Sequence, residues 1–166
     1  AKENISSDLV GQSYEYVTEA MEEIRKLSHS LVVPSLGEFG LKEALEGLVE
    51  DVNLPNNQQV QLLFDEKYNE RDIDKNKELM IYRIVQEQLN NVIKYAAAKD
   101  VVITMKEDNG SILLSVADNG VGFDPSKKSK GIGLKNIRSR VEFYSGNMNI
   151  ISAPGQGCTL EVFIPY

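Results

Sequence analysis

Four polar residues in the middle of the chain have types and spacings that suit nucleotide chemistry. In the stretch 80–98 they are Glu87, Asn91, Lys94 and Tyr95, and steps of four, seven and eight residues place them on one face of a helix. An amide oxygen such as that of Asn91 can bind Mg²⁺, while a carboxylate one turn away polarises a water or takes a proton. A solvated polar face is the alternative interpretation.

A second set lies at the end of an apolar run, in the sequence Asp-Asn-Gly-Val-Gly that begins at Asp118. A carboxylate at the edge of a sheet can accept a hydrogen bond from the exocyclic amino group of adenine, whereas guanine would present a carbonyl to it. Gly120 and Gly122 allow the backbone to turn sharply and to approach a base closely. An ordinary turn that begins with an aspartate is the alternative.

A third set precedes another helix. Gly131 and Gly133 come before the apolar pattern that begins at Leu134, so unpaired amides at the helix N-terminus could bind phosphate oxygens. The loop before them concentrates positive charge in an otherwise acidic chain through Lys127, Lys128 and Lys130. These lysines could also be no more than a solvated loop.

In this order, Glu-x-x-x-Asn on a helix, then Asp-x-Gly-x-Gly, then Gly-x-Gly-Leu, the motifs resemble the N, G1 and G2 boxes of the GHKL ATPase family. The closest match is to the kinase core of bacterial sensor histidine kinases, in the branch with a very short nucleotide lid, here 125–130. The resemblance covers residues 77–166. It implies an α+β fold, a two-layer α/β sandwich with helices on one face of a mixed sheet, preceded by a long N-terminal helix.

The resemblance also implies roles and ligands. The cofactors would be ATP and Mg²⁺, with Asn91 as the metal ligand and Glu87 as the general base or water-orienting residue. The nucleotide would be bound by Asn91, Lys94, Tyr95, Asp118, Gly120, Gly122, Lys130, Gly131, Gly133 and Leu134. The activity would be that of an ATP-dependent protein-histidine kinase that passes its phosphate on to a response regulator.

Two positions depart from the family pattern. Many relatives carry a histidine where this chain has Tyr95, so a phenol replaces an imidazole. Cys158 stands where relatives usually have the threonine of Gly-x-Gly-Thr. We expect Cys158 to be a small buried side chain and Thr159, one step along the strand, to point to the other face.

The apolar patterns predict the elements that must position these residues. Ile81, Val85, Leu89, Val92 and Ala96 form a stripe at helical spacing that needs a larger surface, such as a sheet, to cover it. Further helices are predicted over 41–52 and 134–144. Strands are predicted over 59–64, 101–105, 112–116, 147–152 and 158–164, with a hairpin at Asn109-Gly110.

The N-terminal part differs from the rest. A seven-residue repeat over 10–31 predicts one helix of a dimerising bundle, or else a helix packed on its own domain. Pro34, with the glycines that follow, marks a hinge, which divides the chain into 1–33, a fragment of the dimerisation bundle, and 34–166, the ATP-binding catalytic domain. In the kinase branch that the chain resembles, the phosphorylated histidine typically sits in a Glu-Leu-His-Asp context, whereas the lone histidine here, His29, has serines on both sides. The resemblance therefore implies that the phosphorylated histidine lies upstream of residue 1.

Bulk properties limit the classes of function. The net charge of −7 repels phosphate backbones and argues against non-specific nucleic-acid binding. Cys158 is the single cysteine, and no stretch reaches the ~18 apolar residues of a membrane span, so the sequence predicts a cytoplasmic domain whose parent could be anchored elsewhere. Partners would be a response regulator and, in the parent protein, a second copy. Another GHKL ATPase, such as an anti-sigma-type serine kinase, or an inactive nucleotide-binding module are the alternatives.

Overall fold

The computed structural model describes residues 36–56, 58–66, 73–108, 110–127 and 132–166. They belong to one compact unit that spans Ser35 to Tyr166. The predicted helix over 10–31 and His29 lie outside the described residues. In the part of the chain that the structure describes, no helix is both long and apolar enough to cross a membrane.

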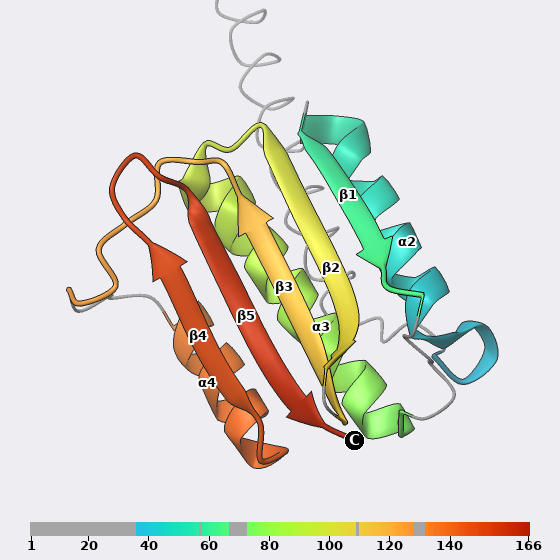
Figure 1. Cartoon of the computed structure of the whole chain (residues 1–166). Coiled ribbons are helices and arrows are strands. Elements are labelled where there is room, and N and C mark those ends of the chain that lie inside the picture. Colours follow the sequence, from blue (N-terminus) through green and yellow to red (C-terminus); the bar gives the residue numbers. More distant parts are fainter. Residues whose placement is uncertain (1–35, 57, 67–72, 109, 128–131) are drawn as a thin grey trace, which may run out of the picture. The chain divides into compact units, whose positions relative to one another are not determined.

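The described part forms two layers. Its elements, in chain order, are α2 (Leu36–Asn56), β1 (Gln59–Phe64), α3 (Lys75–Asn91), η2 (Val92–Ala96), β2 (Asp100–Asp108), β3 (Ser111–Asp118), α4 (Gly133–Phe143), β4 (Asn147–Ser152) and β5 (Cys158–Pro165). The strands form one sheet in the order β1-β2-β3-β5-β4, in which β1 and β2 are parallel and the other pairs antiparallel. Figure 1 shows α2, α3 and α4 on one face of this sheet. The predicted α+β sandwich is therefore confirmed.

Helix α3 lies at the centre of the core. The predicted stripe is buried, since Ile81, Val85, Leu89 and Val92 are at most 1% exposed. Three neighbours outside the stripe, Met80, Tyr82 and Ile84, are buried as well, because α3 also packs against α2 and α4. Alternate residues of β2, β3 and β5 supply the opposing surface. Because parallel β1 and β2 need a long connection, α3 has to cross the sheet between them.

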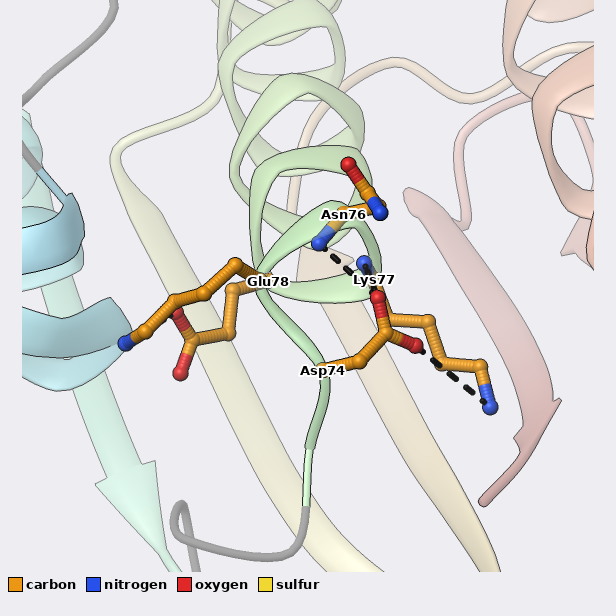
Figure 2. Close-up of polar contacts among 5 residues, drawn as sticks. Asp74, Asn76, Lys77 and Glu78 are labelled. Carbon is orange, nitrogen blue, oxygen red and sulfur yellow. Dashed lines mark hydrogen bonds and ion pairs between the residues drawn. The ribbon is translucent and has the colours of Figure 1, made fainter.

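Helix α3 begins at Lys75, five residues before the predicted start. Asp74 is its N-cap: Oδ1 accepts hydrogen bonds from the backbone N–H groups of Asn76 and Lys77, at 2.9 and 3.2 Å (Figure 2). Nζ of Lys77 lies 3.9 Å from Oδ2 of Asp74 and donates to the carbonyl of Pro165 at 2.8 Å. This first turn therefore ties α3 to the end of β5.

The end of α3 corrects the prediction of one continuous α-helix over 80–98. The α-helix ends at Asn91, and Val92–Ala96 form a π-helical turn, η2, which is followed by Ala97 in the left-handed conformation (φ 49°). A π turn closes i→i+5 bonds and so holds an extra residue per turn. The α-helical spacing that predicted Lys94 and Tyr95 on the face of Glu87 consequently does not continue past Asn91.

Helix α2 leads into the sheet. Its backbone is non-helical at Gly40 (φ 76°, ψ 172°), so the regular part begins at Leu41 as predicted. Near its end, Asn53 bonds both backbone groups of Val60 in β1: Oδ1 accepts the Val60 N–H at 2.8 Å, and Nδ2 donates to the Val60 carbonyl at 3.2 Å. An amide side chain therefore joins α2 to the first strand of the sheet.

We predict that Asp74→Ala lowers the free energy of unfolding by about 1 kcal/mol, because the two amides that Asp74 caps lose their acceptor. Denaturant titration measures the change. Asn76→Ala is the matched control, since only the backbone of Asn76 takes part in this cap. Equal losses in the two variants would contradict the assignment of the cap.

Candidate functional site

Glu87 and Asn91 meet the start of α4. Both side chains are half-buried on the last turns of α3. A Cβ at Gly133, the first residue of α4, would overlap Oε1 of Glu87 and would lie 3.0 Å from Oδ1 of Asn91. The fold thus brings two motifs that are far apart in the sequence close together, and a side chain at position 133 would have to displace the tips of Glu87 and Asn91.

The Asn91 amide has a defined orientation. Its Nδ2 donates to Oε1 of Gln88 at 3.3 Å, and Gln88 is buried. Oδ1 is the nearer of the two amide atoms to a Cβ at Gly133, at 3.0 Å against 3.4 Å for Nδ2. The described residues contain no group of three or more His, Cys, Asp or Glu side chains that could hold a metal ion. A single amide oxygen suits Mg²⁺, which keeps water and phosphate oxygens as its other ligands.

Asp118 is the last residue of β3, next to Cys158 of β5 in the register. The alternation of the strand puts its side chain on the helix-covered face, with Val116. Oδ1 accepts the N–H of Gly120 at 2.9 Å. Burial raises the pKa of Asp118, and hydrogen bonds from the backbone of Gly120 and Cys158 partly offset that rise. A half-buried carboxylate at this end of the sheet is a suitable acceptor for a polar ligand.

The loop after Asp118 is fixed to two other elements. Oδ1 of Asn119 accepts the N–H groups of Lys99 and Asp100, at 2.9 and 3.0 Å, and Nδ2 donates to the Asp100 carboxylate at 2.7 Å. The N–H of Val121 donates to the carbonyl of Ala96 at 2.8 Å, so the loop also docks on η2. Our sequence reasoning missed Asn119, because its partners Lys99 and Asp100 are 20 and 19 residues away in the sequence.

The two glycines of this loop pack against the chain itself. A Cβ at Gly120 would overlap the backbone carbonyl of Ala96, and a Cβ at Gly122 would overlap that of Ala153. Gly122 also has a positive φ of 58°, which side chains rarely adopt. The close approach predicted at these positions therefore exists, but the structure shows it toward protein backbone, and an approach to a base stays a prediction.

Cys158 and Thr159 are arranged as predicted. Cys158 is buried, and Thr159 is half-exposed on the opposite face of β5. Burial, followed by the nearby charge of Asp118, raises the pKa of the Cys158 thiol to about 11. The thiol is consequently neutral at physiological pH and adds no charge beside Asp118.

The remaining predicted site residues are less constrained. Lys94 and Tyr95 are exposed on η2, Tyr95 by 74%, and among the described residues neither forms a hydrogen bond or ion pair with Glu87 or Asn91. Leu134 is half-buried in the first turn of α4. Lys130 and Gly131 lie outside the described residues.

Comparisons with known proteins agree with this geometry. Residues 76–166, which begin in the first turn of α3 and end at the last residue, match the family described as Histidine kinase-, DNA gyrase B-, and HSP90-like ATPase. The chain therefore belongs to this ATPase family, whose members bind ATP. Within the family it is a GHKL domain of the bacterial sensor histidine kinase type.

Individual relatives support the same assignment. Sensor histidine kinase MctS of Rhizobium johnstonii is 30% identical over 160 residues, which are 94% of this chain and 34% of that protein. The chain thus spans about a third of the length of this curated relative. The histidine kinase domain of the blue-light activated histidine kinase from Erythrobacter litoralis EL346 has a TM-score of 0.61 at 19% identity, over 75% of this chain and 60% of that one. The catalytic domain of histidine kinase ThkA has a TM-score of 0.58 at 20% identity, over 78% of this chain and 92% of that one. These two likenesses confirm the fold.

Alanine substitutions at two glycines should separate folding from site geometry. We predict that Gly120→Ala lowers the free energy of unfolding by about 1–3 kcal/mol, because its Cβ meets rigid backbone. In Gly133→Ala the new Cβ would approach only the flexible ends of the Glu87 and Asn91 side chains. This substitution should therefore change the free energy of unfolding by less than about 1 kcal/mol, while it displaces both side chains.

Denaturant unfolding and calorimetric titration with Mg·ATP measure the two effects. Gly47→Ala, at an exposed helical position with open space around it, is the matched control. It should raise the free energy of unfolding by about 0.5–1 kcal/mol, because alanine favours a helix over glycine, and it should leave the Mg·ATP affinity at the parental value. The interpretation fails if Gly133→Ala costs as much stability as Gly120→Ala, or if it leaves Mg·ATP affinity at the parental value.

Proposed function

We propose that this domain binds Mg·ATP and transfers the γ-phosphate to a histidine that lies outside the chain, before residue 1, from which it passes to an aspartate of a response regulator. The observation that carries the proposal is the contact of Glu87 and Asn91 with Gly133 at the N-terminus of α4. It joins a candidate base, a candidate metal ligand and a helix N-terminus, three groups that phosphoryl transfer uses.

Asp118 is the proposed determinant of adenine binding. Its carboxylate accepts a hydrogen bond from the exocyclic amino group, and the charge strengthens that bond. Gly120 and Gly122 hold the loop beside it. A guanine carbonyl would meet this acceptor without a proton between them, so we expect the site to prefer ATP over GTP.

The phosphates would lie between α3 and α4. The N-terminal amides of α4, through Gly131, Gly133 and Leu134, would face the phosphate oxygens, and Lys130 would add positive charge. Lys94 and Tyr95 of η2 are the proposed contacts of the phosphates and the sugar. Mg²⁺, held by Asn91, would neutralise charge on the transferring phosphate.

Glu87 is the proposed catalytic residue. As the acceptor nitrogen of the incoming histidine forms a bond to the γ-phosphorus, the bond from that phosphorus to the bridging oxygen breaks and ADP leaves. A carboxylate within reach of the imidazole can orient the ring and take its proton. Glu87 lies one helical turn from Asn91, which places the base next to the metal ligand.

The rest of the assembly follows from the same proposal. Residues 1–33 would be the second helix of a dimerisation bundle, with His29 at its junction, and 34–166 the catalytic domain. Two copies would associate through that bundle. Because ATP is the phosphoryl donor, we place the domain in the cytoplasm.

The affinity for ATP should depend on pH through Asp118. Because burial raises the pKa of Asp118 in the folded protein, the carboxylate takes up a proton at a higher pH than an ordinary aspartate, whose pKa is about 3.9. ATP affinity is therefore fully present above the raised pKa and is lost as the pH falls through it. Asp118→Asn should weaken binding by about 1.5–3 kcal/mol at neutral pH and flatten this pH dependence.

Calorimetric titration over a pH series tests this prediction. Glu107→Gln, an exposed carboxylate on β2, is the control and should match the parent at every pH. Parental affinity in Asp118→Asn would remove Asp118 from the adenine site.

The kinase activity is tested by acid-labile phosphate. The present chain should bind ATP and take up no such phosphate, whereas a longer chain with the preceding helix should be labelled. Glu87→Ala in the longer chain should slow labelling by about 10²-fold or more with little change in ATP affinity, as expected for a base.

Label on His29 would contradict the position of the acceptor. Hydrolysis of ATP without phosphate on the protein would favour another GHKL ATPase. Binding of ATP without hydrolysis or labelling would favour an inactive nucleotide-binding module.

A further inference from the structure

The hydroxyl of Ser152 joins two backbone segments beside Asp118. Ser152 is the last residue of β4 and is half-buried. Its Oγ accepts the N–H of Phe123 at 2.9 Å and donates to the carbonyl of Gly157 at 2.7 Å. Phe123 lies in the loop that leaves Asp118, and Gly157 lies in the turn between β4 and β5. One side chain therefore satisfies a donor and an acceptor from different segments.

Those two segments pack backbone against backbone. A Cβ at Gly157 would overlap the carbonyl of Asp118, and a Cβ at Gly122 would overlap the carbonyls of Ala153 and Gly157. A direct backbone bond, from the N–H of Gly155 to the carbonyl of Val121 at 2.6 Å, crosses the same contact. The glycines contribute no side chain to this contact. The side-chain group that the structure shows joining the two segments is the hydroxyl of Ser152.

Ser152 also stands in register with the candidate adenine ligand. Ser152 pairs with Cys158 across β4 and β5, and Cys158 pairs with Asp118 across β5 and β3. Paired residues share a face of the sheet, so a hydroxyl, a thiol and a carboxylate form one row at the end of three strands.

We infer that Ser152 is a positioning residue for nucleotide binding. It acts through Phe123 and Gly157, which it holds together so that the loop after Asp118 keeps its binding conformation. This inference rests on the proposed function. When the hydroxyl is absent, the loop occupies that conformation for a smaller fraction of the time, and the apparent dissociation constant rises by the inverse of that fraction.

An isosteric pair of variants tests the role of the hydroxyl. Ser152→Thr keeps Oγ, while Ser152→Val has the same shape without it, and both side chains suit a β-strand. We expect Ser152→Val to raise the dissociation constant of Mg·ATP about fivefold to thirtyfold, the equivalent of one or two lost hydrogen bonds. Ser152→Thr should stay within about twofold of the parent. Ser115→Ala, a hydroxyl on the opposite face of β3, is the matched control.

Each outcome decides the point. Equal affinities of Ser152→Val and Ser152→Thr would overturn the inference, as would a lower melting temperature of Ser152→Val with parental affinity, which is the sign of a purely structural bond. If both variants weaken binding equally, the added methyl group and not the hydroxyl is the cause, and the inference is again wrong. A parent that binds no ATP would overturn the proposed function, and this inference with it.

Discussion

The burial of α3 between the sheet and its flanking helices is the constraint on which the rest of the structure depends. Its apolar stripe faces the strands, so the polar turn with Glu87 and Asn91 has to emerge where α4 begins. The same helix ends in the wider turn η2, which presents the carbonyl of Ala96 to the loop that leaves Asp118. One buried helix therefore sets the position of both halves of the candidate site.

Many of the close contacts that shape the candidate site are made by glycine backbone and not by side chains. Glycines at 120, 122, 133 and 157 let backbone meet backbone or the tips of polar side chains, and each such contact fixes a loop without filling the space that a ligand needs. Its two candidate acidic groups, Glu87 and Asp118, belong to an acidic chain. Attraction for the phosphates must therefore come from backbone amides, a bound cation and a few lysines.

The sequence was informative where the chemistry depends on local spacing. The relation between Glu87 and Asn91, the strand that ends at Asp118, and the buried Cys158 beside an outward Thr159 all follow from helix or strand periodicity. The π turn could not be predicted, because it accompanies a tertiary bond between Ala96 and Val121, which are distant in sequence. The roles of Asn119 and Ser152 were missed for the same reason: their partners lie on other elements.

The amide of Asn53 has a consequence for how the sheet ends. In the sheet order β1 has a neighbour on one side only, and such an edge is a template for pairing with further strands. By bonding both backbone groups of Val60, Asn53 occupies part of that edge with a helix side chain. A strand from another chain therefore cannot pair with the backbone of Val60 unless it displaces Asn53, and two copies could form a continuous sheet through this part of β1 only at the cost of those two bonds.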